Sequence, residues 1–275
     1  MTRLTTGDIS DISEGLIRYN ERLQAATGKT LTGIAAHAFD ADESLVVQRL
    51  KALRVHVIPV TAGQGIISDF SNTVAAILSF LGCRANVCEF TDASGLAAAY
   101  EAGVDAVMLA DDNRFVGIHL GTRSVADNTA LTGRVYAAAL DLMAGGISGK
   151  KAVVLGCGPV GEAGARELGR RGAIPELFDI RRDAARRLAQ RLAQDGIPAN
   201  ILPAFPQKTA AYEYILEATP SAGALPEEII TRHLRIAAPG VPLGMPDKAA
   251  RMLGQRLVHD KLELGTAAMA VRLVL

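Results

Sequence analysis

The sequence is poor in aromatic residues and has no excess of charge of either sign. Of its 275 residues, 4% are aromatic and none is Trp, while Lys and Arg together number 29, as do Asp and Glu. Nucleic acids and anionic membrane surfaces attract basic proteins, and single-stranded nucleic acids stack on exposed aromatic rings. These absences argue against nucleic acid or a membrane surface as the main partner.

Long apolar runs and clustered cysteines are also missing. No apolar run approaches the roughly 20 residues that cross a bilayer, and residues 1–8 lack the apolar core of a secretory signal. Cys83, Cys88 and Cys157 are too few and too scattered for a disulfide framework or a zinc site. We therefore expect a cytoplasmic protein without a metal.

Apolar residues make up 49% of the chain, which is enough for packed cores, and their spacing alternates between that of strands and that of helices. In the first half, helices are expected at 6–27, 42–53, 70–81, 94–102 and 129–143, and strands at 54–60, 85–88 and 105–110. Such alternation predicts parallel pairing in a layered α/β domain.

A second alternating series follows the glycine-rich stretch at 147–150. Strands are expected at 151–155, 176–180, 198–202, 212–218, 234–238 and 256–259, and helices at 159–171, 182–194 and 266–275. We place the domain boundary between an N-terminal α/β substrate domain, 1–148, and a C-terminal dinucleotide-binding domain, 149–275. The last helix is apolar enough to be buried and can pack back on the first domain.

The loop Gly156-Cys-Gly158-Pro-Val-Gly161 directly follows the first strand of the second half and directly precedes a helix. In such a loop Gly156 permits the tight turn, Gly158 lets the backbone approach a pyrophosphate, and Gly161 lets helix and strand pack closely. At Pro159 and Val160 the helix N-terminus directs its N–H groups and positive dipole end towards phosphates. The sequence predicts a Rossmann dinucleotide-binding domain.

Asp179 ends the next expected strand, where a carboxylate can accept hydrogen bonds from a ribose diol. It would repel a 2′-phosphate, which favours NAD over NADP, although Arg181 and Arg182 can also serve NADP. Further cofactor contacts are expected where later strands end, at Ala218, Thr219, Pro220 and Pro239. Taken singly, each of these is equally well explained as an ordinary strand end.

The first domain offers two features for a ligand. The loop at 61–68 follows a buried strand, and its backbone N–H groups can bind a carboxylate or an amide. Asp111 and Asp112 stand at the end of another strand, where carboxylates can hold an ammonium group or accept its proton. Asp127 and Asn128 precede a helix that either can cap.

Other catalytic constellations are not evident. The histidines share no spacing pattern, and we expect each to be structural or on the surface: His37, His56, His119, His233 and His259. No Ser/His/Asp order, Cys/His pairing or metal-ligand cluster is recognisable. We therefore expect neither a metal site nor a covalent nucleophile.

Taken together, these segments resemble the PylD-type pyrrolysine synthases over nearly the whole chain. The similar segments are 58–67, 108–115, Asn128 with 132–133, 154–161, 217–220, 239–242 and 265–269, with 4–5 and 27–28 near the start. The nucleotide loop is generic, but Ala-Asp-Asp-Asn and Pro-Val-Thr-x-Gly-x-Gly together are specific. The chain departs from the family at 262–265, where a glycine-rich run is expected, and at Asp127, where an amide is expected.

The resemblance implies an enzyme of pyrrolysine biosynthesis that uses NAD to oxidise the terminal amine carbon of 3-methyl-D-ornithyl-N6-lysine. Ammonia leaves, and the α-amine of the same unit closes a pyrroline ring, which is favoured because the reaction is intramolecular. By position, Asp111 corresponds to the catalytic carboxylate that binds the substrate amine. The substrate-binding residues implied are Leu4, Thr5, Thr61, Ser68, Phe70, Asp111 and Asn128.

Two other functions stay open at this point. A different two-domain NAD(P) dehydrogenase, acting on an amino or hydroxy acid, would need a lysine or histidine base in the first domain, and Lys29 and Lys51 lie too early in the chain. A non-catalytic NAD-binding sensor would leave Asp111, Asn128 and Phe70 with structural roles only. The partner in all three cases is a small molecule, and the sequence gives no oligomeric state.

Overall fold

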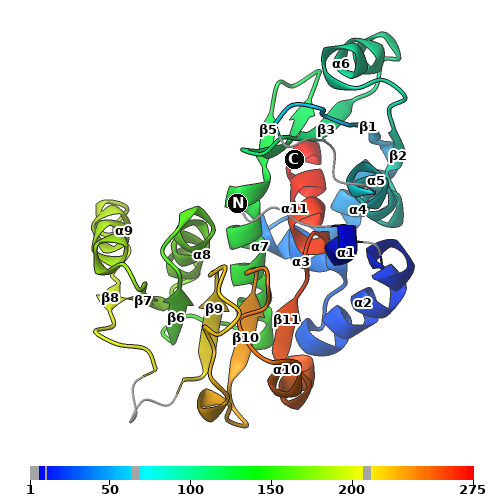
Figure 1. Cartoon of the computed structure of the whole chain (residues 1–275). Coiled ribbons are helices and arrows are strands. Elements are labelled where there is room, and N and C mark those ends of the chain that lie inside the picture. Colours follow the sequence, from blue (N-terminus) through cyan, green and yellow to red (C-terminus); the bar gives the residue numbers. More distant parts are fainter. Residues whose placement is uncertain (1–5, 10, 64–68, 207–211) are drawn as a thin grey trace. The chain divides into compact units, whose positions relative to one another are not determined.

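The structure is a computed structural model that describes residues 6–9, 11–63, 69–206 and 212–275 (Figure 1). The chain forms two compact units: the first contains Met1–Glu21, Thr30–Leu131 and Lys261–Leu275, and the second contains Arg22–Lys29 and Thr132–Asp260. This division differs from the boundary at 148/149, because residues 132–148 group with the second unit and 261–275 with the first.

The first unit contains a five-stranded sheet in the order β2-β1-β3-β4-β5. Its strands are β1 (Arg54–Ile58), β2 (Arg84–Val87), β3 (Ala106–Ala110), β4 (Phe115–His119) and β5 (Val125–Asp127). The expected parallel pairing is correct for β1, β2 and β3 but wrong for β4, which runs antiparallel to both β3 and β5. A connection as short as that between β3 and β4 can join only antiparallel strands.

The helices of the first unit are α1 (Thr6–Ile9), α3 (Leu31–Ala38), α4 (Glu43–Ala52), α5 (Phe70–Phe80), α6 (Asp92–Glu101) and α11 (Glu263–Val274), and α2 (Ile12–Thr27) begins there. The helix α3 was not predicted; it begins after Thr30, whose hydroxyl accepts a hydrogen bond from the Gly33 N–H at 3.0 Å. The helix α11 packs against α3, α4 and α5 (Figure 1). It is buried on nearly every side, as expected for a helix without a broad polar face.

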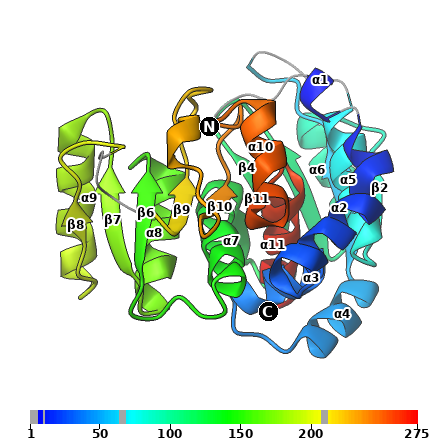
Figure 2. The same cartoon turned by 90° about the horizontal axis from the view of Figure 1, so that it is seen from below.

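The second unit contains a six-stranded parallel sheet in the order β11-β10-β9-β6-β7-β8 (Figure 2). The strands are β6 (Lys151–Leu155), β7 (Ile174–Phe178), β8 (Asn200–Ile201), β9 (Tyr214–Glu217), β10 (Arg235–Ala238) and β11 (Leu257–His259). Counted from β6, this is the doubly wound order 3-2-1-4-5-6 of the Rossmann fold. The predicted fold class, α/β with a C-terminal Rossmann domain, is confirmed.

The helices of this unit are α7 (Asn128–Met143, from Thr132 onward), α8 (Pro159–Arg170), α9 (Arg182–Gln194) and α10 (Asp247–Leu253), with short 3₁₀ helices at Glu227–Ile229 and Gly254–Arg256. The helices α7 and α8 approach closely at Gly133, where a Cβ would overlap the Val160 carbonyl oxygen. Within the described part of the chain, no helix has the length and apolar character needed to span a bilayer.

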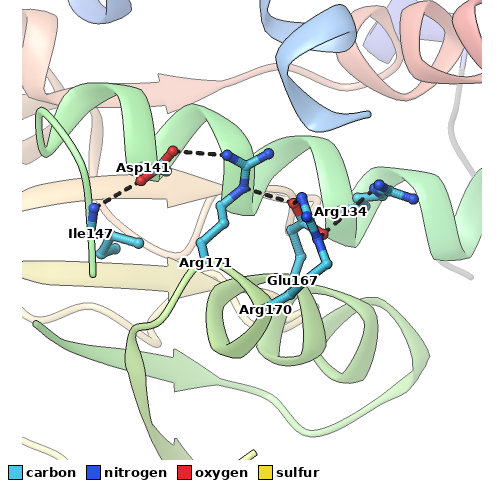
Figure 3. A network of polar contacts seen from close by, with 6 residues as sticks. All are labelled: Arg134, Asp141, Ile147, Glu167, Arg170 and Arg171. Carbon is cyan, nitrogen blue, oxygen red and sulfur yellow. Dashed lines mark hydrogen bonds and ion pairs between the residues drawn. The ribbon is translucent and has the colours of Figure 1, made fainter. Parts of the chain in front are cut away.

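A buried ion-pair network also joins α7 to α8 (Figure 3). Glu167 on α8 is 4% exposed; it accepts hydrogen bonds from Arg170 and Arg171 and pairs with Arg134 of α7. Arg171 also donates to Asp141 of α7 at 2.9 Å. Since each buried charge has an opposite partner, the network fixes α7 against the helix that follows the glycine loop.

Candidate active site

The glycine loop of the second unit has the geometry that its sequence predicts. Gly156 has φ +85°, in the left-handed region, and a Cβ there would lie 2.6 Å from the Ala218 carbonyl oxygen. At Gly161 a Cβ would overlap the carbonyl oxygen of Gly156, so both positions require glycine. At Gly158, by contrast, a Cβ would meet no described atom within 4 Å. The loop is thus closed on the sheet side and open at Gly158, where Pro159 and Val160 begin α8.

Asp179 stabilises this loop from the end of β7. Its carboxylate accepts hydrogen bonds from the Cys157 N–H at 2.9 Å and from the Arg181 N–H at 2.8 Å. The side chain is 9% exposed, and the Arg181 guanidinium lies 3.8 Å from it. Asp179 therefore shapes the loop directly and retains an exposed edge at the place where a ribose diol binds in Rossmann domains.

A pocket of about 330 Å³ opens beside Asp179 at the carboxyl ends of β7 and β8. Its lining comprises Phe178, Asp179, Ile180, Arg182, Ala185 and residues 201–205. Asp179 and Arg182 were predicted as cofactor residues, whereas residues 201–205 were missed because β8 is short and no motif follows it. The feature that marks these residues as part of a binding pocket is exposed apolar surface, since Ile180 is 90% exposed and Ile201 is 43% exposed. Apolar walls of this kind suit a flat ring.

The remaining predicted cofactor residues lie at the carboxyl ends of β9 and β10. Ala218 donates a backbone hydrogen bond to Leu155 at 2.8 Å, which brings the start of the β9 loop beside the glycine loop. The Thr219 methyl would lie 3.1 Å from a Cβ at Gly156. Pro220 follows in the same loop, and Pro239 directly follows β10. The crevice between β6 and β9 is the switch point at which Rossmann domains bind their ligands.

In the first unit, Asp111 closes the β3–β4 hairpin. One carboxylate oxygen accepts the backbone N–H groups of Asn113 at 2.8 Å and Arg114 at 2.7 Å, and the Asp111 N–H donates to the Arg114 carbonyl. These two N–H groups hold the pKa of Asp111 below its ordinary value. The side chain is exposed and held by these hydrogen bonds, so it offers a carboxylate that can pair with a cationic group.

Asp127 stands beside this hairpin. One of its oxygens accepts the N–H groups of Thr129 at 3.0 Å and Ala130 at 3.4 Å, and the other pairs with Arg114 at 2.8 Å. The capping role is therefore confirmed for Asp127, while Asn128 is the first residue of α7. Arg114 links the Asp111 hairpin to the end of β5, which fixes the separation of the two strand ends.

Thr61 follows β1 at the same edge of the sheet. Its N–H and hydroxyl donate to the Asp92 carboxylate at 2.8 and 2.6 Å, and these bonds lower the pKa of Asp92. Asp92 was not predicted as a site residue, because its only local signal in the sequence is its place at the start of a helix. With Asp111, it makes this edge strongly acidic and suited to a cationic group.

Phe70 begins α5 and packs edge-to-face on Phe115, with ring centroids 5.3 Å apart. Because Phe115 pairs with Ala110 in the β3–β4 ladder, this aromatic pair lies next to the Asp111 hairpin. Leu4, Thr5 and Ser68 lie outside the described residues. Of the predicted substrate residues, Thr61, Asp111 and Asn128 follow the ends of β1, β3 and β5, and Phe70 is linked to this edge through its contact with Phe115.

A metal site was not expected, and the described residues contain no group of three or more His, Cys, Asp or Glu side chains suited to a metal ion. The cysteines are buried, and burial raises the pKa of Cys157, inside the glycine loop, to about 12. That thiol is therefore not a nucleophile at neutral pH. The second unit thus has a loop suited to a dinucleotide, and the first unit has carboxylates suited to a cationic group.

Comparisons with solved structures show the fold. The chain is similar to a quinate dehydrogenase from Corynebacterium glutamicum in complex with NAD, with a TM-score of 0.55 and 17% identity over 81% of this chain and 93% of the other. It is also similar to a shikimate 5-dehydrogenase from Thermus thermophilus in complex with NADP(H) and shikimate, with a TM-score of 0.51, at the same identity and coverage. Both are Rossmann-type dehydrogenases, so the fold predicted from the sequence is the fold of that group.

Sequence comparisons are more specific. Residues 8–126 match the model of the family described as "Pyrrolysine biosynthesis protein PylD, N-terminal domain". The chain is 29% identical over 269 residues to a pyrrolysine synthase of Methanosarcina acetivorans, covering 98% of both chains. It is 28% identical to one of Methanosarcina barkeri, covering 98% of this chain and 97% of the other. The resemblance predicted from the sequence is confirmed: the chain is similar to the PylD-type pyrrolysine synthases over nearly its whole length.

Proposed function

We propose that the protein is an NAD-dependent pyrrolysine synthase that oxidises the terminal amine carbon of 3-methyl-D-ornithyl-N6-lysine and closes its pyrroline ring. The observation that carries this proposal is similarity over 98% of the chain to two relatives named pyrrolysine synthase. Features of each unit support it, because the second unit offers a dinucleotide loop and the first an exposed carboxylate whose pKa lies below its ordinary value.

The second unit fits a nicotinamide dinucleotide. The pyrophosphate would lie at Gly158, where the loop is open, and the adenosine in the pocket beside Asp179 and Arg182. The carboxylate of Asp179 would repel a 2′-phosphate and so favours NAD over NADP. When bound, the cofactor accepts a hydride from the substrate carbon.

The first unit fits the substrate amine. Asp111 would hold the terminal ammonium group through a charge-assisted hydrogen bond. Phe70 would form an apolar wall, and Thr61 and Asn128 would bind the polar part of the dipeptide. Because the two N–H groups on Asp111 keep it ionised, its role is to bind the ammonium group, and the proton released from that group passes to solvent.

The chemical steps balance with these groups alone. The ammonium loses a proton, and the neutral amine carbon then loses a hydride, leaving a protonated imine. The α-amine of the ornithyl unit attacks this carbon to form a ring bond, and the original nitrogen leaves as ammonia. The products are the pyrroline, the reduced cofactor, ammonia and two protons, one lost from the ammonium group and one from the α-amine nitrogen. Ring closure needs little help from the protein because the nucleophile belongs to the same molecule.

The test is an assay of the purified protein with NAD and the dipeptide. We expect NADH absorbance to rise in step with ammonia release and with a product of the pyrroline mass. Quinate, shikimate and simple amino acids serve as alternative substrates, and NADP as the alternative cofactor. Reduction with one of those acids but not with the dipeptide would replace the proposal with another dehydrogenase activity. NAD binding without reduction of any substrate would indicate a sensor.

A further inference from the structure

Glu217 carries a buried carboxyl group and was not predicted as a site residue from the sequence. It ends β9, and its side chain is fully buried in the second unit. Oε1 accepts hydrogen bonds from the Thr219 N–H at 2.8 Å and from the Thr219 hydroxyl. Oε2 is buried and has no hydrogen-bond partner among the described residues. Oε1 thus holds the β9 loop through Thr219, whereas Oε2 makes no hydrogen bond to the described residues.

The loop after β10 is shaped around the same carboxyl group. The Gly240 N–H donates to the backbone carbonyl of Glu217 at 3.1 Å. A Cβ at Gly240 would lie 2.6 Å from Oε2, and a Cβ at Gly244 would lie 3.1 Å from Cδ. The two glycines therefore leave the room that the carboxyl group occupies. Any larger residue at Gly240 would push the loop away from β9.

This arrangement is costly for stability alone. A buried carboxyl group with an unpartnered oxygen disfavours folding, and an apolar side chain of similar size would avoid that cost. Groups of this kind concentrate at functional sites. Glu217 lies below the carboxyl ends of β9 and β10, the edge of a Rossmann sheet over which the nicotinamide half of a dinucleotide is bound.

We propose that Glu217 is a positioning residue for the nicotinamide half of the cofactor, because it sets both Thr219 and the loop at 240–244. The inference rests on the dinucleotide site of the proposed function and adds a residue to it. Glu217 does not touch the cofactor itself. In its ionised form it also supplies negative charge below the ring, which favours the cationic ring of NAD over the neutral ring of NADH.

The test compares the binding of ADP-ribose, which lacks the nicotinamide, with that of NAD and NADH at mildly alkaline pH. In Glu217→Gln the shape and one acceptor oxygen remain, whereas Glu217→Leu removes both oxygens. We expect ADP-ribose affinity to stay within about twofold in both variants. NAD affinity should fall about tenfold in Glu217→Gln and further in Glu217→Leu. The preference for NAD over NADH should fall in both.

The matched control is Glu176→Gln on β7 of the same sheet, which loses only an ion pair to the exposed Lys151. It should change none of the three affinities. If Glu217→Leu does not fold, Glu217→Gln and Thr219→Val carry the comparison, because Thr219→Val removes the hydroxyl that Glu217 holds. Equal losses for ADP-ribose and NAD in a folded variant would show that Glu217 is merely structural. Unchanged NAD binding would equally overturn the inference.

These outcomes are separate from the test of the enzyme activity. A wild-type protein that makes the pyrroline while Glu217→Gln binds NAD normally would refute only the positioning role. Conversely, the difference between ADP-ribose and NAD could be found in a protein that does not act on the dipeptide. That result would refute the synthase activity and leave the role of Glu217 intact.

Discussion

At the scale of single residues, Asp111 gives the most direct prediction. Asp111→Asn keeps an oxygen that can accept the N–H groups of Asn113 and Arg114, so the hairpin should be retained. The charge on which the substrate ammonium depends is lost. We expect kcat/KM for the dipeptide to fall by about 10- to 100-fold, the equivalent of a charged hydrogen bond. NAD affinity should be nearly unchanged, which calorimetry can check.

The control is Asp105→Asn, which alters a carboxylate directly before the opposite end of β3, where it pairs with Arg54. This variant should keep full activity, and a loss as large as that of Asp111→Asn would contradict the assignment. Because the pKa of Asp111 lies below its ordinary value, its protonation should not limit activity at mildly acidic pH. A rate that falls with decreasing pH must then depend on another group, such as the substrate amine.

Glu217 predicts how stability depends on pH. Burial raises its pKa from 4.5 to about 7, although the hydrogen bonds from Thr219 oppose the shift. Between these values the folded state keeps a proton that the unfolded state loses, so the free energy of unfolding falls as pH rises through this window. The loss amounts to about 3 kcal/mol. The free energy of unfolding can be measured by urea unfolding below pH 4.5 and above pH 7, for the wild type and for Glu217→Gln. The decrease of about 3 kcal/mol between these pH values that is due to Glu217 should be found in the wild type and not in the variant.

The role of a residue could be predicted from the sequence where its residue type, in its local pattern, has only a few known structural or functional roles. Gly156, Gly158 and Gly161 fall into this class, because a strand, a glycine loop and a helix in direct succession bind phosphate in a known way. Glu217 was not predictable, since a single acid at the end of an apolar strand does not reveal its burial. Burial depends on the neighbouring β10 loop, which is close in space but distant in sequence.

At the scale of elements, the glycine loop predicts two different effects of alanine. In Gly161→Ala the new methyl would overlap the Gly156 carbonyl, so the loop must shift and the free energy of unfolding should fall by about 1–3 kcal/mol. Gly158 has φ −76° and open space around it, so Gly158→Ala should fold as the wild type does. It should nevertheless lose dinucleotide affinity, because the methyl occupies the place of the pyrophosphate.

Titration with ADP-ribose and urea unfolding of both variants check this contrast. Gly121→Ala is a suitable control, since a Cβ there would meet only the His119 ring, at 3.4 Å, and the position lies between β4 and β5 of the first unit. It should change neither stability nor binding. Normal dinucleotide affinity in Gly158→Ala would contradict the proposed placement of the pyrophosphate.

The network between α7 and α8 gives a prediction about stability. Arg171→Met would leave Asp141 buried without its ion pair to Arg171, while Arg134 and Arg170 still pair with Glu167. Removing one member of a buried pair costs about 3–5 kcal/mol. Arg186→Met, which breaks the exposed pair with Asp183, should cost less than about 1 kcal/mol. Similar values for both in urea unfolding would refute a structural role for the network.

Element positions were predicted well where apolar periodicity was strong, as at β6 and α9. The β3–β4 hairpin was missed because its turn, Asp111-Asp112-Asn113, carries residues that suit a ligand as well as a turn. Both interpretations apply to Asp111, whose backbone and one carboxylate oxygen form the turn. The sequence alone cannot separate the two uses, because the hydrogen bonds that define the turn involve backbone groups common to every residue.

At the scale of the whole molecule, the first unit is discontinuous in sequence, which a single boundary at 148/149 could not describe. Its last segment, residues 261–275, is separated from the rest by the entire Rossmann sheet. The apolar character of 266–275 predicted a buried helix, but apolar character does not identify the surface that covers it. That surface is formed by α3, α4, α5 and the strands β4 and β5, and α3 was itself absent from the prediction.

The discontinuity predicts that a chain ending at residue 260 cannot complete its first unit. The helix α11 buries Leu264, Met269, Val271 and Leu273, and each such side chain contributes about 1.5–3 kcal/mol. The sum, about 6–12 kcal/mol, is comparable to the entire stability of a typical domain. We expect the truncated chain to be insoluble, or soluble without a cooperative unfolding transition for the first unit.

Removal of Leu275 alone is the matched control, because that residue is 47% exposed and follows the end of α11. The shortened chain should unfold like the wild type in urea, followed by circular dichroism. If the chain ending at residue 260 kept the same midpoint and slope, α11 would contribute little, and the packing of α3, α4 and α5 would have to be stable without it. A cooperative transition regained on adding a peptide of residues 261–275 would instead show that α11 completes the first unit.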